Sequence, residues 1–137
     1  MCRFDRFRRV ARGLVENSDC HTAMAAIIVK GGKTIAVGWN KSGYYGRSIH
    51  AEEDALKQLR YQKCGPDGAD IHVFRFGASG EERTSKPCKN CFEMIRNAKI
   101  RRIFFTDISS ETSVVKVDNS ESGDFYEVSK KRIARHK

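Results

Sequence analysis

Long hydrophobic runs are missing from this sequence. No stretch of about 18 consecutive apolar residues occurs in it, which excludes a membrane-spanning helix. The opening residues, MCRFDRFRRVARGLV, are interrupted by charged side chains throughout, so they do not form the apolar core of a secretory signal. We therefore expect a soluble, intracellular and cytoplasmic protein that has no membrane partner.

Internal repeats, low-complexity stretches and obvious linkers are also absent. A chain of 137 residues fits one domain of ordinary size and is long enough to bury a core without disulfide bonds. We expect a single domain over residues 1–137, with an N-terminal helix within residues 1–16 and a polar, basic tail over residues 120–137.

The number of cysteines is odd. An odd number of cysteines without an export signal argues against a disulfide framework and favours metal binding or ordinary burial. The five cysteines are Cys2, Cys20, Cys64, Cys88 and Cys91.

Acidic residues are outnumbered. The chain has 17 Asp and Glu against 26 Lys and Arg, and its formal net charge is +9. This balance favours anionic partners through long-range attraction, and both nucleotides and polynucleotides qualify. The arginines of residues 3–12 and the basic residues 130–137 could bind phosphate groups. Equally, they could be a solvated helix face and a soluble tail.

The residue pattern predicts helix, two strands, helix, strand, helix and two strands, in that order. The expected helices span residues 2–16, 50–61 and from 87 or 88 to about 99, and the expected strands span 25–29, 34–37, 71–76, 102–107 and 114–117. Gly31 and Gly32 form the turn of a hairpin between the first two strands. Ser48 is a candidate cap for the second helix. Residues 41–48 and 77–86 are expected to be loops.

Strands that alternate with helices predict an α/β sandwich with right-handed crossovers. The last two strands differ, because only about six residues separate them and a parallel connection needs a dozen or more. We therefore expect these two strands to form an antiparallel hairpin at one end of a mixed, five-stranded sheet.

Two segments carry metal-binding chemistry. Cys88 and Cys91 form a Cys-x-x-Cys pair at a predicted helix start, where the free N–H groups favour thiolates. Two thiolates are an incomplete zinc shell, and His50 at another helix start can supply a third ligand. Two Cys and one His leave one position open, which marks a catalytic zinc. The alternative is a structural zinc or unrelated buried side chains.

Glu52 lies two residues after His50 and is not needed as a ligand. Water on an open zinc position has its pKa lowered to about 7 and becomes a usable hydroxide. Glu52 could take a proton from that water and deliver it to the substrate. The alternative is a helix residue that only complements the helix dipole.

The arrangement His50-x-Glu52 followed by Pro87-Cys88-x-x-Cys91 is the pattern of zinc nucleobase deaminases. Over roughly residues 20–107 the sequence resembles the cytidine and deoxycytidylate deaminase superfamily. The resemblance implies a three-layer α/β/α fold. It also implies one catalytic Zn²⁺ per chain on His50, Cys88 and Cys91, with Glu52 as the proton shuttle.

The resemblance extends to substrate contacts. Gly38-Trp39-Asn40 is similar to the family's Gly-x-Asn at the end of the second strand, where the Asn commonly holds the sugar hydroxyl. Ala51 matches the position whose backbone N–H contacts the base. Trp39, Tyr44 and Tyr45 could stack on a base or could be packing residues, and Asn40 could be a plain turn residue.

The expected final hairpin is similar to that of the free-nucleoside cytidine deaminases. The deoxycytidylate, tRNA-adenosine and polynucleotide branches usually place a helix there and run the strands parallel. We therefore expect a hydrolase that converts cytosine to uracil in a nucleoside or nucleotide, by hydroxide attack at C4. This activity belongs to the class that cleaves the C–N bond of a cyclic amidine.

Two other functions stay open. Net positive charge favours an enzyme that deaminates cytosine, or adenine, in single-stranded DNA or RNA. A zinc-stabilised binding module without catalysis is the non-enzymatic alternative, and the presence of Glu52 argues against it. The resemblance also implies homo-oligomerisation, because a neighbouring subunit often completes such a site in the family.

Overall fold

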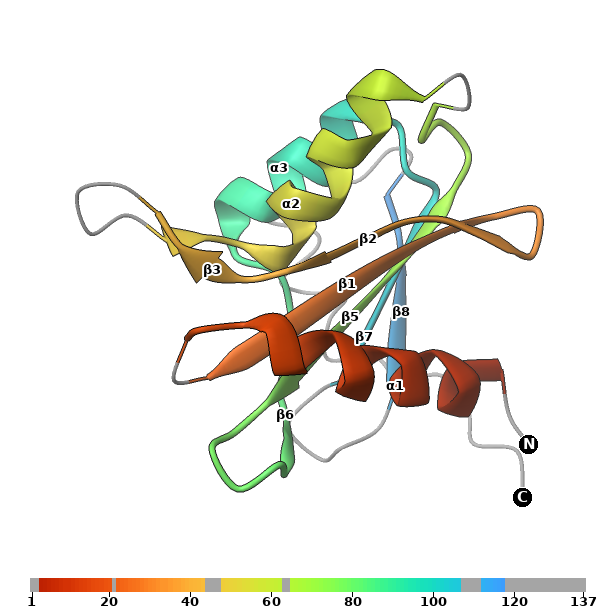
Figure 1. Cartoon of the computed structure of the whole chain (residues 1–137). Helices are drawn as coiled ribbons and strands as arrows, with labels where there is room; N and C mark the ends of the chain where they lie inside the picture. The colour runs from red at the N-terminus through yellow and green to blue at the C-terminus, as the bar shows by residue number, and fades with distance from the viewer. Residues whose placement is uncertain (1–2, 21, 44–47, 63–64, 107–111, 118–137) are drawn as a thin grey trace.

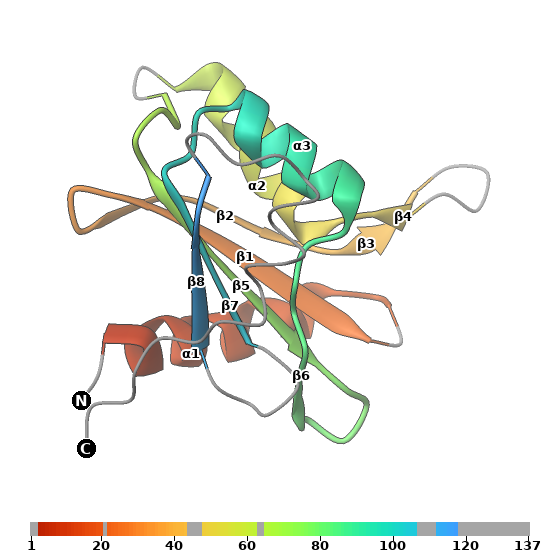
Figure 2. The same cartoon turned by 180° about the vertical axis from the view of Figure 1, so that it is seen from behind.

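The fold is a sheet covered by helices on both faces, as a computed structural model shows for residues 3–20, 22–43, 48–62, 65–106 and 112–117 (Figure 1). Helix α1 lies on one face of the sheet, and α2 and α3 lie side by side on the other (Figure 2). The helices are α1 Arg3–Leu14, α2 Ala51–Gln58 and α3 Lys89–Asn97, with 3-10 turns at Val15–Asn17 and Leu59–Tyr61. The expected three-layer architecture is confirmed.

The main sheet has the strand order β2-β1-β5-β7-β8, with the short β6 paired to β5. Its strands are β1 Ala23–Lys30, β2 Lys33–Trp39, β5 Asp70–Phe76, β6 Glu82–Arg83, β7 Arg102–Thr106 and β8 Thr112–Lys116. Strands β5 and β7 run parallel, and the other pairs run antiparallel. The sheet is therefore mixed, as expected.

Both predicted hairpins are present. Gly31 and Gly32 join β1 to β2 with φ of 60° and 77°, the left-handed conformation that a tight hairpin turn requires at both central residues. Strand β8 returns antiparallel to β7, with Phe104 opposite Val114. The short connection between them had predicted this pairing.

The start of α2 differs from expectation. Ser48 lies in the small strand β4 Ser48–Ile49, which pairs with β3 Lys41–Ser42, and the helix cap is His50. The side chain of His50 makes no capping hydrogen bond. The prediction that Ser48 caps the helix is therefore wrong, because Ser48 is opposite Ser42 in a ladder and the chain turns only two residues later. Part of each expected loop, at 41–48 and 77–86, is thus short strand.

Strand β1 explains why the middle of the sheet is apolar on both sides. Ala26 and Ile28 pack under α2 and α3, while Ala25, Ile27 and Val29 pack under α1. A strand that is covered on both faces needs apolar residues at successive positions rather than at alternate ones. The uninterrupted run from Ala25 to Val29 meets this need.

Two arginines of α1 attach that helix to the sheet. Arg8 Nε lies 2.6 Å from Glu82 Oε1, and Arg12 Nη1 donates to the carbonyl oxygen of Gly80 at 2.9 Å. The guanidinium of Arg12 also lies 4.5 Å from the ring centroid of Phe76. Arg8 and Arg12 therefore hold α1 in place, so these two arginines of the basic N-terminal segment have a structural role.

The basic tail over residues 120–137 lies outside the described residues, as do Tyr44 and Tyr45. Within the described part of the chain, no helix combines the length and the apolar character that crossing a bilayer requires.

Gly38 lets α2 approach β2 closely. A Cβ atom at this position would lie 2.5 Å from both Ala51 O and Ala55 N, which are backbone atoms of α2. Real Cβ atoms do not come so close, so only glycine allows the first turn of the helix to rest on the strand. This contact sets the position of the segment that carries His50 and Glu52.

We predict that Gly38→Ala lowers the free energy of unfolding by about 1–3 kcal/mol, because the added methyl group overpacks a backbone contact. Urea denaturation measures the change. Gly13→Ala is the matched control, since nothing lies within 4 Å of a Cβ at Gly13 in α1. The free energy of unfolding of this control should be unchanged or higher by up to about 1 kcal/mol. Equal stability of the two variants would contradict this packing argument.

Candidate metal centre and active site

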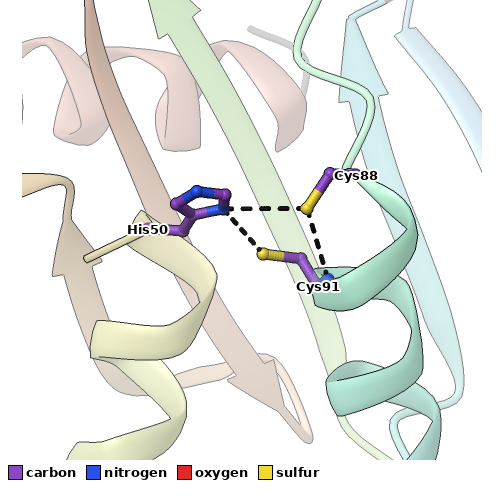
Figure 3. Close-up of side chains that lie close together, drawn as sticks. All are labelled: His50, Cys88 and Cys91. Atoms are coloured by element: carbon purple, nitrogen blue, oxygen red, sulfur yellow. Dashed lines mark hydrogen bonds between the residues drawn. The ribbon is translucent and has the colours of Figure 1, made fainter. Parts of the chain in front are cut away.

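Three side chains from two helix starts meet on the α2–α3 face of the sheet (Figure 3). His50 caps α2, Cys88 caps α3, and Cys91 lies in the first turn of α3. His50 Nδ1 is 3.1 Å from Cys91 Sγ and 3.7 Å from Cys88 Sγ. Their donor atoms all lie within 4.8 Å of one another. The predicted ligand set is thus brought together, in a group placed to bind one metal ion.

The separations fit zinc. With Zn–S of about 2.3 Å and Zn–N of about 2.0–2.1 Å, a tetrahedral ion keeps neighbouring donor atoms about 3.5–3.8 Å apart. The two distances from His50 Nδ1, 3.1 and 3.7 Å, lie close to this range. Sulfur and imidazole nitrogen are also the donors that zinc prefers.

The backbone of α3 orients Cys88. Its Sγ accepts a hydrogen bond from the backbone N–H of Cys91 at 3.4 Å. The first N–H groups of a helix have no partner within the helix and can donate to a side chain at the cap. The Cys-x-x-Cys spacing therefore aims the two sulfurs at one point.

Cys91 is buried, with only 1% of its surface exposed. Burial raises the pKa of its thiol, and the neighbouring Glu52 carboxyl and Cys88 thiol raise it further. A divalent cation between these groups reverses this effect, because a coordinated thiol loses its proton. The cluster of anionic groups is thus unfavourable by itself and favourable around a cation.

Glu52 lies in the first turn of α2 and is 1% exposed. Burial raises the pKa of its carboxyl, and the interactions with His50 and with Cys91 lower it in part. Its Oε1 atom has no hydrogen-bond partner among the described residues. Buried polar atoms are nearly always hydrogen-bonded in folded proteins. This orphaned oxygen beside the ligand group therefore marks a place for a bound molecule.

Asn40 is held by the segment before β1 and by β1 itself. Its Oδ1 accepts hydrogen bonds from Ser18 Oγ at 2.7 Å and from the N–H of Met24 at 2.8 Å. Its Nδ2 donates to the carbonyl oxygen of Thr22 at 2.8 Å. These bonds use both acceptor positions of Oδ1 and one hydrogen of Nδ2, so the amide has a fixed orientation and one further donor hydrogen.

Asp54 joins the end of β2 to α2. Its carboxylate accepts a hydrogen bond from the N–H of Trp39 at 3.2 Å and pairs with Lys41 Nζ at 3.1 Å. Lys41 Nζ also lies 4.8 Å from the ring centroid of Trp39, so one face of that ring carries a cation. Ala51 is fully buried at the start of α2, where its N–H has no partner within the helix.

No pattern in the sequence indicates that Ser18 and Asp54 support the site. Ser18 lies in a polar stretch without periodicity, and Asp54 matches an ordinary acidic residue at a helix start. Only the approach of distant segments shows their partners, since Ser18 and Asn40 are 22 residues apart.

The fold and this site together define a domain of mixed α/β architecture with a site for one zinc ion. A family model, the cytidine and deoxycytidylate deaminase zinc-binding region, matches residues 3–107. The chain belongs to this deaminase family.

Solved structures with the same fold include deaminases. Cytidine deaminase from Burkholderia pseudomallei shares 17% identity, with 85% of this chain and 94% of that chain covered and a TM-score of 0.68. Cytidine deaminase from Mycobacterium leprae shares 15% identity over 85% and 95% of the two chains, with a TM-score of 0.62. The dCMP deaminase of cyanophage S-TIM5 shares 23% identity over 75% and 82%, with a TM-score of 0.59. A search of curated protein sequences found no match.

We predict that the purified chain binds one zinc ion and that Cys91→Ser loses it, because two of the three donors remain. Metal analysis by mass spectrometry measures the content, and circular dichroism checks that the variant is folded. Cys20→Ser is the matched control, since Cys20 is a free cysteine outside the group. Zinc retained by Cys91→Ser at the wild-type level would contradict the ligand assignment.

Proposed function

We propose that this chain is a zinc-dependent hydrolase that converts cytosine to uracil in a nucleoside or nucleotide. The observation that carries the proposal is the buried Glu52 carboxyl, with its unpartnered Oε1, beside His50, Cys88 and Cys91. A structural zinc site has no use for such a carboxyl. Family membership gives the reaction class.

His50, Cys88 and Cys91 would hold the metal ion. When bound, this ion would supply Lewis-acid chemistry that makes water a nucleophile near neutral pH. Glu52 would carry out the proton transfers. Its carboxylate takes a proton from the water that attacks C4 of the ring and delivers it to ring nitrogen N3. The proton of the hydroxyl group added at C4 then passes through Glu52 to the exocyclic amine, which leaves as ammonia while the C4 carbonyl of uracil forms.

The environment of Glu52 suits this work. A group that accepts and then returns a proton is most efficient when its pKa lies near the working pH. Burial raises the pKa of Glu52 in that direction. The same burial excludes bulk water from the proton path.

Asn40 and Ala51 are the proposed substrate contacts. The remaining Nδ2 hydrogen of Asn40 would donate to a sugar hydroxyl, while Ser18, Thr22 and Met24 keep the amide in that orientation. The N–H of Ala51 would contact the base from the start of α2. Stacking of Trp39, Tyr44 or Tyr45 on the base stays a hypothesis.

Two observations favour a small substrate over a polynucleotide. The antiparallel β7–β8 hairpin is the connection that we associated with free-nucleoside deaminases. Arg8 pairs with Glu82 and Arg12 donates to the carbonyl oxygen of Gly80, so these two arginines are held by contacts within the chain. A mononucleotide is within this class, since the cyanophage dCMP deaminase was solved in complex with dCMP and dUMP.

We predict that Glu52→Gln lowers kcat by about 10²–10⁴-fold with the zinc content unchanged, because the amide cannot carry the proton. Release of ammonia from cytidine measures activity, and mass spectrometry measures zinc. Glu53→Gln is the matched control, because Glu53 is the next residue and pairs with Lys57 at 3.7 Å on the helix surface. Full activity in Glu52→Gln would show that the proton path is wrong.

We predict turnover of cytidine, deoxycytidine or their monophosphates, and little or none of a single-stranded oligonucleotide. Mass-spectrometric detection of uracil products at low and high salt separates the cases, since polynucleotide binding weakens steeply with salt. A 2′,3′-dideoxy nucleoside lacks both ring hydroxyls of the sugar, so its KM should be raised if Asn40 donates to one of them. Turnover confined to the oligonucleotide would favour the editing alternative, and no turnover of any substrate by zinc-loaded protein would favour a binding module.

A further inference from the structure

A hollow lies on the face of the sheet that α1 covers, away from the zinc-binding group. It has a volume of about 510 Å³ and lies between α1, the β1–β2 turn and the first residues of β5 and β7. His72 of β5 lines it and pairs in register with Ile27, which packs under α1. The helix starts that carry His50 and Cys88 lie on the opposite face (Figure 2). The two sites are therefore separate.

Three arginines and one carboxylate set the charge of this hollow, which we call the arginine pocket. Arg102 Nη2 and Arg101 Nη2 lie 2.9 and 3.3 Å from Asp70 Oδ2, so one carboxylate is shared by two guanidinium groups. Arg6 adds a third positive charge, which leaves a net charge of +2 among these four residues. Each guanidinium has five N–H donors, and Asp70 uses two from each of its partners.

Three buried rings lie beside two of these arginines. The ring of His72 is 4.4 Å from the ring centroids of both Phe7 and Phe104, tilted by 38° to the first and stacked on the second. Arg6 lies over the Phe7 ring at 5.1 Å, and Arg102 lies over the Phe104 ring at 5.2 Å. The three rings are at most 7% exposed, so they form a rigid support. Positively charged groups that are fixed before binding lose little conformational entropy when a ligand arrives.

Glycine keeps the opposite side of the pocket open. Gly31 and Gly32 of the β1–β2 turn, and Gly68 before β5, line the pocket without side chains. A Cβ at any of these positions would meet nothing within 4 Å. The space facing the arginines is thus left for a ligand.

We propose that the arginine pocket binds a phosphate-bearing anion, either free phosphate or the phosphate groups of a nucleotide. Guanidinium groups match the geometry of phosphate oxygens through paired N–H donors, and a net charge of +2 complements a phosphate dianion. The negative charge of Asp70 does not prevent this binding, because Asp70 is paired with both Arg101 and Arg102 and the pocket keeps a net positive charge. The inference does not depend on the deaminase activity, since no residue of the pocket belongs to the zinc-binding group.

The test is binding to the full-length, zinc-loaded chain, with inorganic phosphate and adenosine diphosphate as separate probes. Calorimetry gives the affinities, and amide shifts of Gly31, Gly32 and Gly68 in NMR spectra locate the site. Adenosine diphosphate lacks cytosine, so it tests the pocket without acting as a proposed substrate. Tighter binding of one probe tells free phosphate from nucleotide.

Variants that change the charge of the arginine pocket test the proposal further. Arg101→Gln should weaken binding by at least about tenfold, because charge-assisted hydrogen bonds are lost. Asp70→Asn should strengthen binding, because the net charge of the pocket rises; this opposite sign separates a charge effect from loss of folding. Arg83→Gln is the matched control, an exposed arginine that pairs with Glu81 outside the pocket. Absence of glycine shifts with both probes, or equal affinities of Arg101→Gln and Arg83→Gln, would overturn the proposal.

Discussion

The structure depends on the meeting of two helix starts over one face of the sheet. Helix α2 brings His50 and Glu52, and α3 brings Cys88 and Cys91, so that His50 Nδ1 and Cys91 Sγ lie 3.1 Å apart. Burial and the neighbouring Glu52 carboxyl and Cys88 thiol raise the pKa of the Cys91 thiol. A cation bound between the donor atoms offsets this effect, because a coordinated thiol loses its proton. The sheet holds the two helix starts in the positions that this site needs.

The rest of the architecture supports this arrangement. Gly38 lets α2 rest directly on β2, and Asp54 ties the end of that strand to the same helix. Ser18 orients Asn40 from a segment before β1. On the other face, α1 is attached through Arg8 and Arg12, and the stacked rings around His72 fill the space beneath it. One sheet thus separates a metal centre from a basic pocket.

The sequence predicted most of the elements, because their signals are local. Apolar periodicity, the Gly31-Gly32 turn and the short final connection depend only on neighbouring residues, and each was confirmed. The prediction for Ser48 failed because a serine near a helix start is a typical cap, whereas its pairing with Ser42 depends on how a loop folds back. Local chemistry cannot reveal such a competition.

By itself, the sequence determined the donor set and the order of strands and helices. His50, Glu52, Cys88 and Cys91 have a spacing that suits few other chemistries, and helix starts place them without knowledge of the whole fold. Only the tertiary structure decided how charge is distributed. It attached Arg8 to Glu82, left Glu52 Oε1 without a hydrogen-bond partner in the described part of the chain, and gathered Arg6, Arg101 and Arg102 around one pocket. Net charge is a sum over the sequence, but what each charge does depends on which distant residue it contacts, and that contact exists only in the folded chain.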